Sequence, residues 1–116
     1  MKKLLLVIGL MLYSVQPLYA VDYQTGNDLV NKWQEYKKAH EGKPYSIYDE
    51  GAFMGYVNGV AETAPFIIYP KSTTIGQLCS VVGTWIEAHP EKWTDAPLDI
   101  VTTALKEAFS LQKKSK

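Results

Sequence analysis

Few side chains in this sequence are of the types that bind metals or carry out catalysis. The two histidines, His40 and His89, lie far apart, and neither has another metal-binding residue at a recognised spacing. Each lies where a helix is expected to end, a position at which the helix dipole favours a histidine. We therefore expect no metal site and no bound cofactor.

Cys79 could act as a nucleophile if a histidine accepted the proton of its thiol. It falls, however, within an apolar pattern of helical period that is formed by Ile75, Leu78, Cys79 and Val82. A free cysteine in such a pattern behaves as a small buried hydrophobe. The plain interpretation of Cys79 is therefore a core residue and not a catalytic one.

Three carboxylates, Asp49, Glu50 and Glu62, border a second apolar pattern. A glycosidase needs two carboxylates that face each other across a substrate cleft. Asp49 and Glu50 instead fit the first turn of a helix, and Glu62 fits a solvated position. The sequence also lacks a glycine-rich phosphate loop and a nucleophile elbow. These observations predict that the protein is not an enzyme.

The first 20 residues have the pattern of a bacterial export signal. Lys2 and Lys3 precede an apolar run at 4–13 that is too short to span a bilayer, and Ala20 offers a small residue for cleavage. We expect residues 1–20 to be a cleaved signal peptide. Residues 21–116 would then form one domain in the periplasm, with no membrane attachment.

The net charge and the cysteine content exclude further classes of protein. Of the 12 basic residues, Lys2 and Lys3 belong to the signal, which leaves 10 lysines against 12 acids and a net charge near −2. A nucleic-acid-binding domain would show a basic face, so no nucleic-acid partner is expected. Small exported domains usually carry disulfides, but a chain with Cys79 as its one cysteine cannot form an internal bridge. We therefore expect apolar packing, either alone or together with oligomerisation, to hold the domain together.

Helical periodicity and capping residues predict four helices after the signal. Their expected ranges are 27–39, 48–63, Thr74 to the residue before Pro90, and Asp95 onwards with Pro97 in the first turn. Three residue pairs have the spacing of a capping box: Thr25 with Asp28, Ser46 with Asp49, and Thr74 with Gln77. The predicted fold class is all-α, a small single domain of four main helices.

The segment 64–73 joins the second and third helices. It carries a β-branched and aromatic run between two prolines and is too short to build a sheet. We expect an extended connector that buries Phe66 and Ile68. The two helices that follow each carry an apolar face, which includes Ile75 and Trp85 in the third helix and Leu98 in the fourth.

Three glycines recur every four residues in the second helix, at Gly51, Gly55 and Gly59. Glycine destabilises a helix interior by about 1 kcal/mol relative to alanine, so we expect this glycine stripe to have a structural or functional role. A four-residue step keeps the three glycines on one side of a helix. We expect a close-packed seam, formed with the first or third helix of the same chain or, as the alternative, with a second copy or another partner.

Several segments together resemble the Rap/Tai-like family of small periplasmic proteins. They are "TGNDL", "FMGYVNGVAET" and "YPKSTTIGQLCSVVGTWIEAHPEKWTDAPLDIVTTALKEAF", and the similarity covers nearly all of residues 25–109. The resemblance implies an all-α domain. It also implies an immunity protein, because characterised members bind and block type VI secretion effectors, notably peptidoglycan amidases, in the periplasm.

The resemblance also points to four positions at which relatives often carry cysteines. They correspond here to Trp33, Phe53, Tyr69 and Leu111. We expect apolar contacts to replace the family's disulfides at these positions. Specifically, Trp33 should pack on Phe53, and Tyr69 should pack on the end of the last helix.

The leading hypothesis is a periplasmic immunity protein that sterically blocks a cognate effector, and we expect it to form a homodimer. Exposed aromatic and charged residues on two connectors are the candidate contacts: Tyr69 and Lys71 on 64–73, and His89, Glu91 and Trp93 on 89–95. Core packing is the alternative role for Trp93. The alternative function is a periplasmic acid-stress chaperone similar to the HdeA family, or another non-enzymatic periplasmic binding protein. Such a chaperone should lose its dimer and expose apolar surface at low pH.

Overall fold

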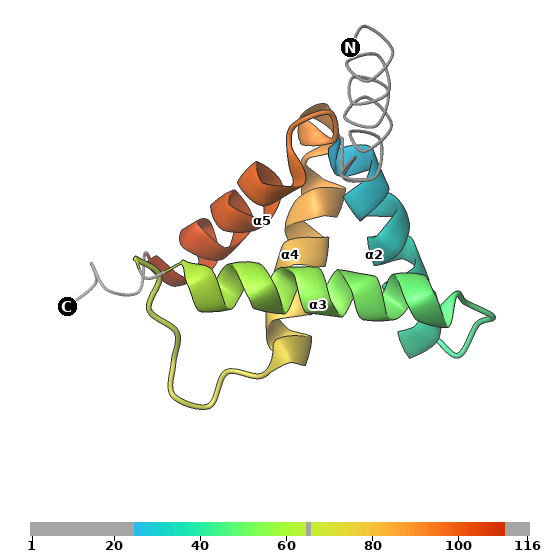
Figure 1. The fold of residues 1–116 in the computed structure, drawn as a ribbon, viewed down its shortest axis with the longest axis horizontal. Coiled ribbons are helices and arrows are strands. Elements are labelled where there is room, and N and C mark those ends of the chain that lie inside the picture. The colour runs from blue at the N-terminus through green and yellow to red at the C-terminus, as the bar shows by residue number, and fades with distance from the viewer. Residues whose placement is uncertain (1–24, 65, 111–116) are drawn as a thin grey trace, which may run out of the picture.

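The computed structural model describes residues 25–64 and 66–110, and every regular element in this part of the chain is helical (Figure 1). The elements are α2 (Gly26–His40), α3 (Ile47–Thr63), α4 (Ile75–Ala88), the 3-10 turn η2 (Pro90–Lys92), α5 (Pro97–Leu105) and the π-helical turn η3 (Lys106–Ser110). This confirms the predicted all-α class and the four main helices. Residues 1–20, which are expected to form a signal peptide, and Leu111 lie outside the described residues.

Helix α3 lies across the other three helices, which converge towards the turn between α4 and α5 (Figure 1). It contacts α2, α4 and α5. Nineteen buried apolar residues form a single cluster between the helices, and the largest fully buried ones are Phe53, Leu29, Ile86, Ile100 and Leu105. Cys79 belongs to this cluster and is fully buried, as its apolar surroundings in the sequence predict.

Two of the three predicted helix caps form. The Ser46 hydroxyl accepts a hydrogen bond from the backbone N–H of Asp49, and Thr74 and Gln77 make a complete capping box. The side-chain cap predicted for Thr25 is wrong. Helix α2 is instead fixed at its start by tertiary contact, because the backbone N–H of Gly26 donates to the carbonyl of Asp95 at 2.7 Å.

The expected burial of Phe66 and Ile68 is also wrong. Their side chains are 56% and 55% exposed, while Ile67 between them is 5% exposed and belongs to the core. In an extended segment neighbouring side chains point to opposite sides, so burying Ile67 turns both of its neighbours outwards. Ile75 and Leu98, which were expected on the apolar faces of their helices, are exposed as well.

Aromatic contacts form at three of the four positions for which the family resemblance implies cysteines, Trp33, Phe53 and Tyr69. The ring centroids of Trp33 and Phe53 are 5.5 Å apart and join α2 to α3, as predicted. Tyr69 packs edge-on against Phe109 at 5.0 Å, which ties the connector to the end of the last helix. Aromatic pairs in these geometries are favourable beyond the area that they bury.

The expected intramolecular seam along the glycine stripe of α3 is wrong. Gly51, Gly55 and Gly59 are exposed, and a methyl group added at any of them would meet nothing within 4 Å. The close approaches occur at two other glycines. A side chain at Gly83 would overlap the indole of Trp33, and one at Gly26 would lie 2.7 Å from the carbonyl oxygen of Trp93.

Replacing Gly51, Gly55 or Gly59 with alanine is therefore expected to stabilise the domain by roughly 0.5–1 kcal/mol per site. Alanine has less backbone freedom to lose on folding, and its methyl group would enter open space. Urea denaturation followed by circular dichroism measures the change. The reverse substitution in the same helix, Ala52→Gly, is the control and should destabilise. A loss of stability in the alanine variants would show that this side of α3 packs against something in the folded protein.

Candidate functional site

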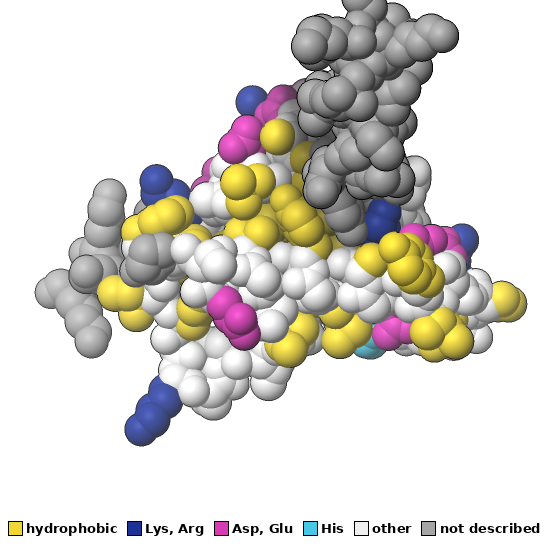
Figure 2. Space-filling view, viewed as in Figure 1, with side chains coloured by type: hydrophobic (Ala, Val, Ile, Leu, Met, Phe, Trp, Pro, Cys, Tyr) yellow, Lys and Arg dark blue, Asp and Glu magenta, His cyan; other side chains and the backbone are white. Residues whose placement is uncertain are grey.

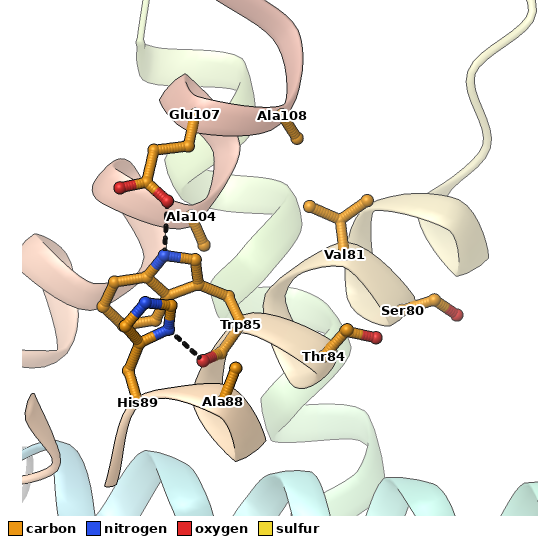
Figure 3. A pocket seen from close by; sticks show the side chains of 9 residues that line it. All are labelled: Ser80, Val81, Thr84, Trp85, Ala88, His89, Ala104, Glu107 and Ala108. Carbon is orange, nitrogen blue, oxygen red and sulfur yellow. Dashed lines mark hydrogen bonds between the residues drawn. The ribbon is translucent and has the colours of Figure 1, made fainter. Parts of the chain in front are cut away.

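A hollow of about 510 Å³ lies between α4 and the α5–η3 segment. Its floor and walls are largely apolar, and Figure 3 shows Val81, Ala104 and Ala108 around the same space as the indole of Trp85. Thr84 and Ala88 complete the α4 side. The hollow is therefore a small surface depression with one large aromatic ring in its wall.

The Trp85 ring is held on two sides. Its indole N–H donates to Oε2 of Glu107 at 2.7 Å, and the ring of His89 stacks on it with centroids 4.0 Å apart (Figure 3). Nδ1 of His89 lies 2.8 Å from the Trp85 carbonyl oxygen, which fixes the imidazole in turn. The arrangement places a carboxylate, an indole and an imidazole in fixed positions at one end of the hollow.

A second hollow of about 690 Å³ adjoins the first and shares Ser80 and Val81 with it. It is bounded by the connector residues Pro70 and Ser72–Thr74 and, on α2, by the stacked rings of Tyr36 and His40, 4.2 Å apart. We call the two hollows together the α4 groove. The groove runs along α4 from the connector to His89.

The groove is open because the side of α4 that lines it carries small side chains. Gly76, Ser80, Thr84 and Ala88 follow one another every four residues, so small uncharged side chains line one side of the helix. Glu87 is the one charged residue of α4. The groove was not predicted from the sequence. The uncharged strip of small residues beside Trp85 is the sequence feature that indicates it.

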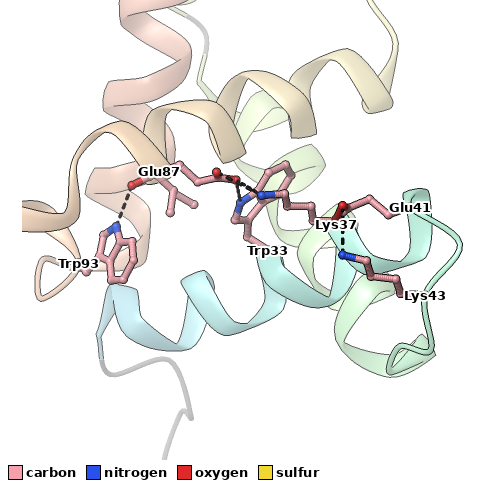
Figure 4. A network of polar contacts seen from close by, with 7 residues as sticks. Trp33, Lys37, Glu41, Lys43, Glu87 and Trp93 are labelled. Carbon is pink, nitrogen blue, oxygen red and sulfur yellow. Dashed lines mark hydrogen bonds and ion pairs between the residues drawn. The ribbon is translucent and has the colours of Figure 1, made fainter.

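The residues that were predicted to contact a partner do not lie together in the structure. His89 lies in the α4 groove, and Lys71 and Glu91 are exposed on separate connectors. Tyr69 is half-buried, and its hydroxyl donates to the Ala61 carbonyl at 3.4 Å. Trp93 is also half-buried against the core, and its indole N–H donates to the Ile86 carbonyl at 2.8 Å (Figure 4).

Cys79 has the properties of a structural cysteine. Burial raises the pKa of its thiol to about 11, against a smaller lowering effect of the Tyr36 hydroxyl. The nucleophilic form of cysteine is the thiolate, which such a pKa keeps scarce at neutral pH. Among residues 25–64 and 66–110, no three histidine, cysteine or acidic side chains cluster as metal ligands would.

A polar network beside the core joins α2 to α4. The indole N–H of Trp33 donates to Oε2 of Glu87 at 2.8 Å, and Lys37 pairs with the same carboxylate at 3.2 Å (Figure 4). The hydrogen bond from Trp33, and next the contact with Lys37, lower the pKa of Glu87 below its ordinary value near 4.5, against a raising effect of burial. This network orients the same Trp33 ring that packs on Phe53 and Gly83.

The stability that Glu87 contributes is expected to disappear in acid. Because its pKa is lower in the folded state, the contribution is complete above the unfolded pKa and is lost as pH falls through the folded pKa. Glu87→Gln keeps an acceptor for Trp33 but removes the charge. The difference in unfolding free energy between wild type and variant should be constant at neutral pH and shrink below about pH 4.5.

Urea denaturation at a series of pH values measures this difference. Glu91→Gln is the control, since Glu91 is exposed and has no hydrogen bond to the described residues. A difference that stays unchanged down to pH 3 would contradict the assigned role of Glu87.

None of the described helices is both long enough and apolar enough to cross a membrane. No curated protein and no solved structure shows significant similarity to the chain. A family comparison does find a match, to the Rap1a immunity proteins, over residues 25–110. This range includes every described helix, and the chain therefore belongs to the family of Rap1a immunity proteins, a non-enzymatic family.

Proposed function

We propose that this chain is a periplasmic immunity protein that binds a cognate type VI secretion effector, a peptidoglycan amidase, and blocks its active site sterically. The observation that carries the proposal is the family match across the whole described domain. A steric inhibitor needs a folded surface and no reactive group of its own. The buried, protonated thiol of Cys79 is consistent with that requirement.

The connector between α3 and α4 is the better of the two candidate inhibitory segments. It extends away from the helices as a loop (Figure 1). Phe66, Ile68 and Lys71 are all exposed on it. Exposed apolar side chains gain most when a partner removes them from water, and the anchor at Tyr69 limits the freedom of the loop before binding.

The 89–95 turn offers less to a partner. Its one large aromatic residue, Trp93, packs against the core and uses its indole N–H internally. Figure 2 shows apolar side chains at both ends of α3. One end carries Ile47 and Tyr48, and at the other the connector carries Phe66 and Ile68. We place the inhibitory contact at the connector end because that end also adjoins the α4 groove.

Co-expression with the effector tests the proposal. The probe is a candidate amidase effector, chosen by a search of the genes that adjoin the gene of this chain and directed to the periplasm, with cell survival and co-purification as readouts. The full chain should protect cells, and a version without residues 1–20 should not, because it would stay in the cytoplasm. A full chain that neither protects nor co-purifies contradicts the proposal.

The connector is tested by the double variant Phe66→Ser with Ile68→Ser. Both side chains are exposed, so the fold should keep its stability while protection is lost. Tyr48→Ser, which removes an 80% exposed aromatic at the other end of α3, is the matched control. Retained protection in the double variant would move the inhibitory contact elsewhere on the domain.

The predicted homodimer and the acid-chaperone alternative are separated by sedimentation at pH 7 and pH 3. An acid chaperone loses its dimer and exposes apolar surface to a fluorescent dye at low pH. An immunity protein keeps its fold and binds one partner tightly. Comparison of wild type with the Gly51, Gly55 and Gly59 alanine variants reports whether the exposed side of α3 takes part in a dimer.

A further inference from the structure

The geometry points to a subsite for a basic side chain in the hollow between α4 and α5. We propose that a lysine or arginine of the bound effector enters it, with its methylene groups on Val81, Ala104 and Ala108 and its charged end beside Glu107 and Trp85. This inference rests on the proposed function, since the partner is the effector. It places part of the interface away from the connector tip, on the outer side of α4.

The first support is the state of the Glu107 carboxylate. Oε2 accepts the Trp85 indole N–H, while Oε1 has no partner among the described residues. The side chain is exposed, so Oε1 can accept a hydrogen bond from an incoming ammonium or guanidinium group. Because the indole already fixes the carboxylate, little side-chain freedom remains to be lost on binding.

The second support is the apolar wall. A lysine or arginine carries a long aliphatic stem, which gains by leaving water when its charged end stays solvated or paired. The methyl groups of Val81, Ala104 and Ala108 provide that surface (Figure 3).

The third support is the balance of charge around the hollow. Among residues 25–64 and 66–110, Glu107 is the one acidic residue that lines the hollow, and no lysine lines it. The neighbouring Lys106 turns away, with its Nζ 5.7 Å from the centre of the Phe66 ring. Asp99, about two helical turns before Glu107, adds an exposed carboxylate to α5. An anionic side chain would be repelled here, whereas a cationic one is complementary.

The continuity of the groove links this subsite to the connector. The hollow shares Ser80 and Val81 with the second hollow, which connector residues border. A partner segment that meets the connector can therefore extend along α4 to Glu107. The connector would contribute affinity by burying apolar side chains. The subsite would add specificity for a basic residue of the partner.

Peptide titration tests the chemistry of the subsite without the effector. The probes are acetylated Gly-Lys-Gly amide and the same peptide with norleucine or glutamate in place of lysine. The readout is the nuclear magnetic resonance signal of the Trp85 indole N–H, assigned with a Trp85→Phe variant. The lysine peptide should shift this signal, leave those of Trp33 and Trp93 unchanged, and bind more weakly as salt rises.

Norleucine separates charge from apolar filling, because it has the stem of lysine without the ammonium group. It and the glutamate peptide should bind at least about fivefold more weakly than the lysine peptide. Glu107→Gln, which keeps an acceptor for the Trp85 indole, should remove the preference. Glu62→Gln on α3 is the matched control and should keep it. Equal shifts with lysine and norleucine, or a preference that survives in Glu107→Gln, would overturn the inference.

The effector provides the second arm. Glu107→Gln and Thr84→Trp, which fills the hollow from an exposed position, should each weaken effector binding about tenfold or more, with unchanged thermal unfolding. Binding that is equal to wild type in both variants overturns the subsite and leaves the proposed function intact. Failure of the wild-type chain to bind the effector would instead refute the proposed function.

Discussion

Gly83→Ala is expected to destabilise the domain by about 3 kcal/mol, at the upper end of the usual range for overpacking. The added methyl group would overlap the indole ring of Trp33. That ring cannot move aside easily, because it contacts Phe53 and Tyr36 and donates its N–H to Glu87. Typical domains are stable by only about 5–15 kcal/mol, so this single methyl group would remove a large part of the total.

Urea denaturation followed by tryptophan fluorescence measures the loss. Gly76→Ala in the same helix is the matched control, since its added methyl group would meet its nearest atom at an ordinary 3.8 Å. Gly55→Ala provides a contrast of opposite sign, because its surroundings are open. A Gly83→Ala variant that is as stable as wild type would contradict the close packing of Trp33 against α4.

Phe53→Ala is expected to destabilise the domain by about 4 kcal/mol, within the range for deleting a buried aromatic ring. Phe53 is fully buried and contacts the rings of both Trp33 and Tyr36 at 5.5 Å. Its removal would leave a cavity where α2 and α3 meet. Thermal and urea unfolding both measure the change.

Tyr48→Ala in the same helix is the control for Phe53→Ala. Its side chain is 80% exposed, so stability should change by no more than about 0.5 kcal/mol. Similar losses in the two variants would contradict the assignment of Phe53 to the core. A large loss confined to Phe53 would show that aromatic packing carries the contact between α2 and α3.

The aromatic contacts between the helices are important for stability because the domain has no disulfide bond. Cys79 is the only cysteine of the chain and is buried, so α2, α3 and the connector are held by packing alone. Trp33 and Phe53 join the first two helices, and Tyr69 and Phe109 join the connector to the last. A rigid connector is what a steric inhibitor requires, which links these contacts to the proposed function.

The sequence by itself determined the helices of this protein. Ser46 and Thr74 cap their helices as predicted, and α2 ends at His40, one residue beyond its predicted end, with Gly42 at a φ of 72° just after it. These features are local, because a cap or a stop acts within about one helical turn. The motif order that resembles the immunity family could also be recognised without coordinates, since it depends only on residue types and spacing.

Only the tertiary structure decided which surfaces are covered. Gly55 and Gly83 look alike in the sequence, yet one faces open space and the other lies against Trp33. The run around Ile67 can bury either of two alternating sets of side chains, and contacts with the helices select Ile67 over Phe66 and Ile68. Capping and periodicity carry no information about such contacts between distant segments.

The α4 groove is also created by contacts between segments that are distant in the sequence. Trp85 and Glu107 lie 22 residues apart and come together only because α5 packs beside α4. Sequence periodicity placed Trp85 on the apolar face of its helix, and packing leaves its ring half-buried against the core, held by a carboxylate and an imidazole. Local sequence therefore set the elements, and the packing of distant segments created the hollow, since apolar burial is non-directional and takes its geometry from the whole fold.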